Sequence, residues 1–186
     1  MNKPAVFTLA LLLLFLRPAP SLAVRFSPTQ PDSSAHKSDD ATIFAIFDEV
    51  NSADIATARL GMKKAQSPKV RALARMVASD HEQVQQMARD LARKLSVVPA
   101  PPDNDKSPDE LARTLAGLQE KSGTDFDRSY LLHEIEFHRS AIEAVKTKLL
   151  PAIQSEEFKT LVRNVLPGLE HHLAETEEVA RSLDYK

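Results

Sequence analysis

Residues 67–95 read SPKVRALARMVASDHEQVQQMARDLARKL, and this stretch decides the fold class. Ser67 followed by Pro68 is typical of a helix N-terminus, because serine caps free backbone N–H groups and proline is tolerated in the first turn. Apolar residues then recur at alternating steps of three and four, which places them on one helix face. They are Val70, Leu73, Val77, Val84, Ala88, Leu91 and Leu95. His81 fills the gap in this series, so the stretch predicts a long amphipathic helix with a histidine on its apolar face.

Three further stretches have the same helical spacing and are predicted to be helices over about 40–62, 124–150 and 155–183. A helix with one apolar face must bury that face against other elements. β-Architectures are excluded, because 4 glycines and 5% aromatic residues in 186 cannot supply the turns and strands of a sandwich or barrel. The predicted fold class is therefore all-α, with four long helices in one bundle.

The connections between these helices predict the topology. The turns near 63–67 and 150–155 are short, so each joins an antiparallel helical hairpin. The link over 96–123 contains Ser107-Pro108-Asp109-Glu110, a capping-box pattern that predicts a short helix over about 108–121. Such a link can run back along the bundle. We therefore expect a ferritin-like antiparallel four-helix bundle with a short extra helix in the crossover between helices 2 and 3, and a simple up-and-down bundle is the alternative.

Residues 1–23 have the features of a signal peptide. Lys3 supplies a positive charge, residues 7–16 form an apolar run, and Ser21-Leu22-Ala23 is a small-residue cleavage motif. Cleavage is expected after Ala23, which predicts a periplasmic or secreted protein. No stable membrane anchor is expected after cleavage, because the apolar run is too short to cross a bilayer.

The part of the chain after the signal peptide divides into a leader and a domain. Residues 24–38 are polar and rich in proline, which predicts a disordered leader, and the bundle domain is expected over 39–186. The net charge of −2 does not indicate a nucleic-acid partner. The chain has no cysteine, which excludes disulfides and lipid attachment at a thiol. The sequence identifies no protein partner and leaves a homodimer open.

Each predicted long helix places an ionisable side chain on its apolar face, and these side chains form the candidate site. They are Asp54, His81, His138 and His172, with Asp80 and Glu134 beside them. Counted from the nearest turn, the first four lie near mid-height of the bundle, since a helix rises about 1.5 Å per residue. Imidazole nitrogen and carboxylate oxygen are ligands of zinc, iron, manganese and copper. The set therefore predicts a transition-metal site in the core.

The same residues also fit a structural interpretation. Neutral histidines that hydrogen-bond to Asp54, Asp80, Glu134 or Tyr130 would form a buried polar network. Such a network would only fix the packing of the helices, as in a structural, interaction or envelope-stress module.

A metal-dependent redox enzyme is a further alternative. Ferritin-like di-iron enzymes carry Glu three residues before His on each of two helices. In this chain Ala78, Ile135 and Leu169 stand three residues before the candidate histidines. The chain also lacks a nucleophile motif, a phosphate-binding loop and the zinc-protease spacing of histidines. We therefore expect no enzyme activity.

The other three histidines are expected at the surface. His171 is next to His172 and therefore about 100° from it around the helix. His133 lies off the apolar face of its helix, and His36 lies in the leader. None of the three is a candidate ligand.

Three short motifs occur along the chain in a characteristic order. Met76-Val77 is followed by Asp80-His81, Phe126-Asp127 is followed by Tyr130, and Leu166-Pro167 is followed by His172. In this order and spacing they resemble the bacterial family called domain of unknown function 4142, over residues 40–183. The resemblance implies a ferritin-like bundle in an exported protein and implies no activity. Members of the family usually carry Glu where this chain has Asp54, so the resemblance implies a weaker or larger site at that position.

Overall fold

The computed structural model describes residues 33–185, and every regular element within this range is helical. The elements are α1 (Ser33–Lys64), α2 (Pro68–Lys94), α3 (Ser107–Gln119), α4 (Gly123–Ala144), the π-helical segment η1 (Val145–Leu149), α5 (Leu150–Ala152) and α6 (Glu156–Ser182). The predicted all-α class is confirmed. Over the same residues, none of the helices is both long enough and apolar enough to span a membrane. The predicted signal peptide and residues 24–32 of the predicted leader lie outside the described residues.

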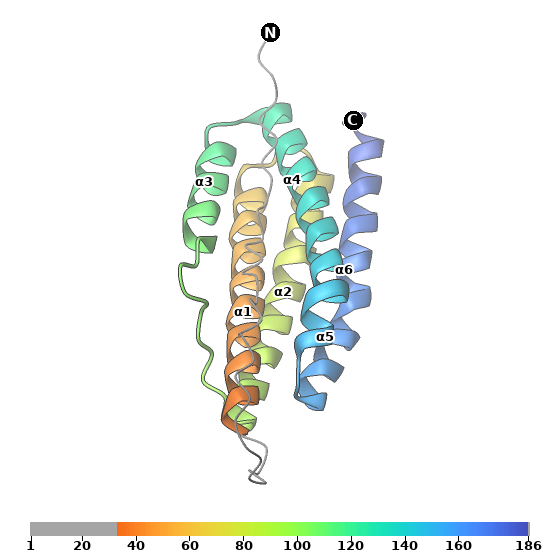
Figure 1. Ribbon diagram of the computed structural model, residues 1–186. Helices are drawn as coiled ribbons and strands as arrows, with labels where there is room; N and C mark the ends of the chain where they lie inside the picture. The colour runs from red at the N-terminus through yellow and green to blue at the C-terminus, as the bar shows by residue number, and fades with distance from the viewer. Residues whose placement is uncertain (1–32, 186) are drawn as a thin grey trace, which may run out of the picture.

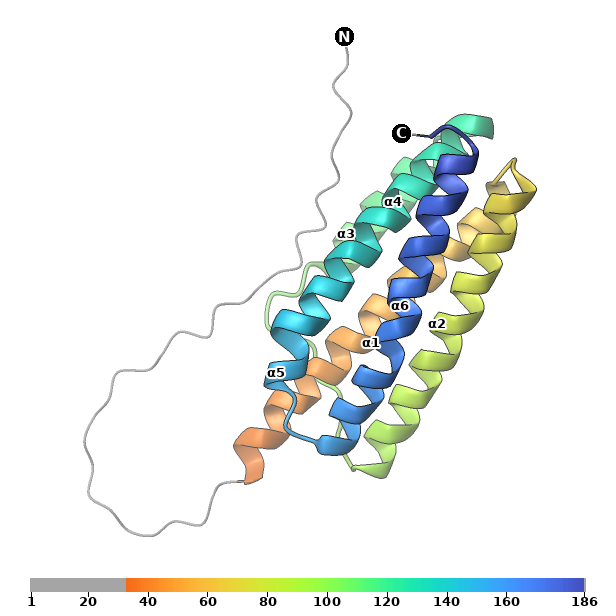
Figure 2. The ribbon, with the colours of Figure 1, turned by 90° about the vertical axis from the view of Figure 1, so that its right-hand side faces the viewer.

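Four long helices, α1, α2, α4 and α6, lie side by side (Figures 1 and 2). α1 and α2 form one antiparallel hairpin, and α4 leads through η1 and α5 into α6 to form a second one. After α2 the chain runs back along α1 to α3, which packs on α1 and α4 (Figure 1). Because α1 and α6 each contact both α2 and α4, every helix has antiparallel neighbours and lies diagonal to a parallel one.

The two hairpins begin their second helices in the same way. The Ser67 hydroxyl accepts a hydrogen bond of 3.2 Å from the backbone N–H of Lys69, and the Ser155 hydroxyl accepts one of 3.2 Å from Phe158. Both serines are the N-cap residues of their helices, at the positions that the sequence predicts.

Two helix ends differ from the prediction. Ser107 is the first residue of α3 and not its cap, because Asp105 already accepts a hydrogen bond of 2.9 Å from the backbone N–H of Ser107. The prediction of a capping box at Ser107 is therefore wrong. Pro151 does not end the preceding helical segment, which continues to Ala152. Proline lies here in the first turn of α5, where its missing N–H group costs little.

The core consists of two apolar clusters with a polar layer between them. One cluster contains Val70, Leu73, Val77, Phe126, Tyr130 and Leu131, and the other contains Ile43, Phe44, Phe47, Val145, Phe158 and Val162. In the second cluster Phe44 and Phe158 stack with ring centroids 3.6 Å apart. On each long helix, buried polar residues separate the segment in one cluster from the segment in the other. The polar layer therefore crosses the bundle at the height that the sequence predicts for the candidate site.

Two buried aspartates join the hairpins at opposite ends of the bundle. Asp127 of α4 accepts hydrogen bonds of 2.8 and 2.7 Å from the backbone N–H groups of Gln66 and Ser67, in the α1–α2 turn. Asp40 of α1 accepts bonds of 2.8 and 2.8 Å from those of Gln154 and Ser155, in the turn before α6. Each hairpin thus supplies a carboxylate that caps the turn of the other. We call Asp40 and Asp127 the clamp aspartates.

Candidate metal centre

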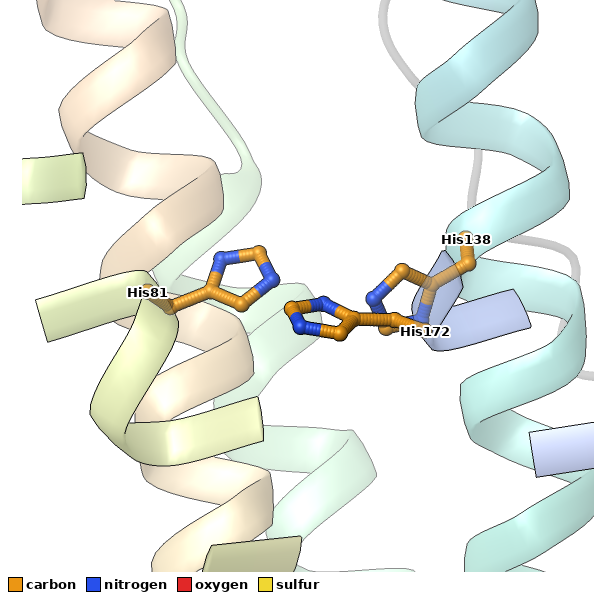
Figure 3. Close-up of side chains that lie close together, drawn as sticks. All are labelled: His81, His138 and His172. Carbon is orange, nitrogen blue, oxygen red and sulfur yellow. The ribbon is translucent and has the colours of Figure 1, made fainter. Parts of the chain in front are cut away.

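Four predicted site residues meet in the polar layer, one from each long helix. Asp54 comes from α1, His81 from α2, His138 from α4 and His172 from α6, and none is more than 3% exposed. The three imidazole rings point toward one another (Figure 3). Their centroids lie 5.7, 5.2 and 5.3 Å apart, so the rings form a nearly equilateral triangle.

The potential ligand atoms lie close together. Each of the three histidines offers one ring nitrogen, and these nitrogens lie within 4.8 Å of one another. Oδ2 of Asp54 lies 2.9 Å from Nε2 of His81 and 3.4 Å from Nε2 of His138. Asp54, Glu134 and His138 form a second group with ligand atoms within 4.8 Å. The three histidines therefore form one potential ligand group, and Asp54 belongs to a second group that shares His138 with the first.

The tautomer of His81 is set by Asn51, one turn before Asp54 on α1. The Asn51 amide nitrogen donates a hydrogen bond of 2.6 Å to the carbonyl oxygen of Phe47, so its Oδ1 is the atom that faces His81. Nδ1 of His81 lies 3.0 Å from this oxygen and must donate to it. When the imidazole is neutral, its lone pair is therefore on Nε2, next to Asp54.

His138 and His172 are oriented in the same manner. Nδ1 of His138 lies 2.9 Å from the carbonyl oxygen of Glu134, which can only accept, so Nδ1 carries the hydrogen. Nε2 of His172 lies 3.0 Å from Oδ2 of the half-exposed Asp80, so Nε2 donates and Nδ1 keeps the lone pair. A histidine ligand commonly donates its second N–H group to a carboxylate or a carbonyl in this way.

The atoms left over are the ones that face the centre. Nε2 of His81, Nε2 of His138, Nδ1 of His172 and both carboxylate oxygens of Asp54 are buried and have no hydrogen-bond partner within residues 33–185. The close contact between His81 and Asp54 does not have hydrogen-bond geometry. Buried polar atoms without partners are costly and rare, and here they gather in one place. A cation at this place would offset the cost of leaving them unpaired.

Electrostatics keep these groups in the states that bind a metal. Desolvation by burial lowers the pKa of His138 and of His172, which favours the neutral imidazoles. Burial acts against the charge of Asp54, but the attraction of His81 and His138 outweighs it and holds the pKa of Asp54 below its ordinary value. The attraction that holds Asp54 anionic requires positive charge beside it, and a bound metal ion would supply this charge once the imidazoles are neutral.

Glu134 is a second, neutral carboxyl group beside the first. Desolvation and the negative charge of Asp54 raise the pKa of Glu134 well above its ordinary value. Its Oε1 lies 3.2 Å from the hydroxyl of Thr57, and its Oε2 has no hydrogen-bond partner among the described residues. Burial, together with Glu134 and Asp54, also raises the pKa of the neighbouring Tyr130. Glu134 would therefore become an additional ligand only on losing its proton, which a bound cation would favour.

The geometry favours one ion rather than two. Both groups of potential ligands contain His138, and Nδ1 of this residue is held by a carbonyl oxygen. Only Nε2 remains for a metal, and one imidazole nitrogen binds one ion. The two groups therefore describe alternative positions of a single ion.

The remaining predicted residues have other roles. Asp80 does not reach the centre but orients His172, and this role follows only from the packing of α2 against α6. His171 is exposed, as predicted, and the side chain of His36 lies outside the described ones. The surface position predicted for His133 is wrong. It is half-buried in a cavity with Pro102 and Ser107, because the crossover covers this face of α4.

Asn51 is the functional residue that the sequence analysis missed. The available signal was its position three residues before Asp54, which places both on the same face of α1. An asparagine on an apolar helix face requires a partner, and here that partner is a histidine of the site.

Comparison with known proteins assigns the chain to a family. Neither the curated proteins nor the solved structures give a significant match to the chain. The family described as Domain of unknown function (DUF4142) matches residues 26–179. This range contains every residue of the candidate centre together with Asn51 and Asp80. The chain therefore belongs to the domain of unknown function 4142 family.

Proposed function

We propose that this protein binds one divalent first-row transition-metal ion in the core of its helices. The candidate ligands come from two groups that share His138, with His81 and His172 in one and Asp54 and Glu134 in the other. Five buried ligand atoms that converge without hydrogen-bond partners carry the proposal. Imidazole nitrogen with carboxylate oxygen suits zinc, iron, manganese or copper.

The arrangement of the helices supports the ferritin-like part of the proposal. Two antiparallel hairpins and a crossover that carries α3 are the features of a ferritin-like bundle, in which metal sites form between facing helices. The ligand set differs from the di-iron type, because three of its five candidate residues are histidines. We therefore propose a mononuclear centre that stores, buffers or delivers the ion.

A purely structural network is the second candidate function. The hydrogen bonds of Asn51 to His81 and of Asp80 to His172 favour it, because they connect three helices without any metal. A complete network would leave few buried atoms unpaired. The five atoms at the centre instead have no hydrogen-bond partner among the described residues, and only the ion-pair contacts of Asp54 with His81 and His138 offset their desolvation. The metal site accounts for them and the structural network does not.

We also propose that the protein works outside the cytoplasm. The support comes from residues 1–23, which contain the positively charged Lys3, an apolar run and a small-residue cleavage motif ending at Ala23. An N-terminal sequencing of the protein recovered from the periplasm tests this, and the expected first residue is Val24.

Metal analysis of protein purified without an affinity tag tests the function. After incubation with zinc, iron, manganese or copper and desalting, we expect about one equivalent of the preferred ion. His81→Ala, His138→Ala and His172→Ala should each lose most of it. His171→Ala is the matched control, because this exposed neighbour of His172 should keep the metal. Less than about 0.1 equivalent in the wild type, with no change in Tm on adding any of the four metals, would leave only the structural network.

A further inference from the structure

An apolar cavity of about 320 Å³ adjoins the candidate centre. His81 and His172 line it, together with Asn51 and Asp80. Its other walls are largely apolar and come from α1, α2, α4, η1 and α6, and they include Phe47, Val84, Met87, Val145, Leu149 and Leu169. On each helix these residues lie on the same side of the histidine layer, toward the α5 end of the bundle. The centre therefore forms one end of the cavity.

The size and length of the cavity limit what it can hold. A cavity of roughly 150 Å³ accommodates benzene, so one about twice that size suits a ligand of about 12 non-hydrogen atoms. The lining residues on α6 extend from Asn164 to His172, which spans about 12 Å at the rise of a helix. The cavity therefore suits an elongated ligand better than a compact one.

The wall of the cavity has two unusual backbone features. Val145 and Leu149 reach its wall from the π-helical segment η1, and such segments occur frequently at functional sites. Gly168 also lines it, and a Cβ atom added there would meet nothing within 4 Å. The helix thus has space at Gly168 where another residue would carry a side chain.

Charge identifies the polar end of the ligand. Asp80, His81 and His172 are the ionisable residues that line the cavity, and its lining contains no lysine or arginine. A divalent ion would offset the negative charges of Asp54 and Asp80, and an anionic ligand group would bind as a further ligand of the ion itself. Without the ion, Asp80 would repel the same group. An anionic ligand should therefore bind the metal-loaded protein and not the metal-free one.

We propose that the cavity binds an elongated apolar monocarboxylate with a chain of about eight to ten carbons, whose carboxylate faces the metal ion. Its chain lies along the apolar walls. This inference rests on the proposed function, because the ion supplies the positive charge that the lining lacks.

Calorimetric titration with octanoate and with 1-octanol tests the inference, since the two share a chain and differ in charge. Octanoate should bind the metal-loaded protein at least about tenfold more tightly than the metal-free one. The affinity of octanol should change less than about threefold between the two forms. Gly168→Leu should abolish the binding of both probes and leave the metal content unchanged. Ala174→Leu, at an exposed position of the same helix that does not line the cavity, is the matched control.

The outcomes separate this inference from the proposed function. Gly168→Leu should fold, because leucine is a better helix former than glycine and the site has room. A protein that binds one metal ion but binds octanoate no better than octanol overturns the inference and leaves the metal site. A protein that binds octanol but no metal overturns both. Binding that appears only after deletion of residues 24–32 shows that the N-terminal segment of this chain occupies the cavity, and it too overturns the inference.

Discussion

Buried carboxylates lie in two regions of this protein and differ in how they are satisfied. At the ends of the bundle, the two oxygens of Asp127 and the two of Asp40 each accept a backbone hydrogen bond of 2.7 to 2.8 Å. At mid-height, both oxygens of Asp54 and one oxygen of Glu134 have no hydrogen-bond partner among the described residues. The residue types and the burial are similar in the two regions, and only the partners differ.

This difference distinguishes the carboxylates that stabilise the fold from the carboxylates proposed to bind a metal. The clamp aspartates accept hydrogen bonds from two main-chain turns and join the hairpins, so contacts within the folded chain account for both residues. The centre holds a charge and several lone pairs that the chain itself leaves unpaired, at a cost in stability. Buried polar atoms without partners lower the stability of the folded protein, and we expect them where a bound ligand supplies the missing partner.

Breaking a clamp should have the largest effect on stability. Asp127→Ala leaves the partly buried backbone N–H groups of Gln66 and Ser67 without their partner, and it should lower the free energy of unfolding by about 3 to 5 kcal/mol. Asp40→Ala should have a similar effect at the other end. Urea denaturation measures both. A loss below about 1 kcal/mol would show that water replaces the clamp.

Adding metal should raise the free energy of unfolding through the centre and not through the clamps. At a free metal concentration about 100 times the Kd, the free energy of unfolding of the wild type should rise by about 2.7 kcal/mol. Asp127→Ala should gain the same increment, because the clamp is remote from the centre. His138→Ala should gain almost nothing. Thermal melts with and without the metal, followed by a chelator, make the comparison, and an equal gain in His138→Ala would contradict the assignment of the ligands.

Removing the support of a ligand should have a smaller effect, confined to the metal. Asn51→Ala frees the ring of His81 from its hydrogen bond and should weaken metal binding by about 10- to 100-fold. Gln85→Ala is the control, because Gln85 also joins α2 to α1 but contacts Asp48 and Ser52 rather than the centre. Competition with a chelating dye gives both affinities. Equal weakening by the two variants would assign Asn51 a purely structural role.

The smallest expected effect is a change in the pH dependence of the metal-free protein. The pKa of Glu134 is higher in the folded than in the unfolded chain, so its stabilising contribution is complete below its unfolded pKa and declines as pH rises toward the folded one. The pKa values of His138 and His172 are lowered on folding, so their contribution is present above about pH 6.5 and is lost as pH falls. The two trends oppose each other between pH 5 and 7.

Glu134→Gln removes one of these opposing trends. Between pH 5 and 7 the stability of the variant should rise more steeply with pH than that of the wild type, by up to about 1.4 kcal/mol per pH unit. Urea denaturation at pH 5, 6 and 7 measures the two slopes. Parallel slopes would mean that Glu134 is ionised in the folded protein.

Much of this arrangement could be predicted from the chain alone, because it depends on local periodicity. Apolar spacing predicted the long helices, and Ser67 with Pro68 predicted where one of them begins. Counting residues from the turns was enough to predict that Asp54, His81, His138 and His172 lie at one height. The rise of a helix is constant, so height follows from sequence position.

What each side chain does at that height depended on how the helices are rotated and packed against one another. The sequence placed both Asp54 and Asp80 among the candidates, yet Asp80 faces outward and orients His172 while Asp54 faces the centre. The crossover covered His133, and a carboxylate from the opposite hairpin capped each turn. These contacts join residues far apart in the chain, and helical periodicity carries no information about which neighbour a face will meet. Only the packed helices therefore distinguish the ligands from the residues that orient them.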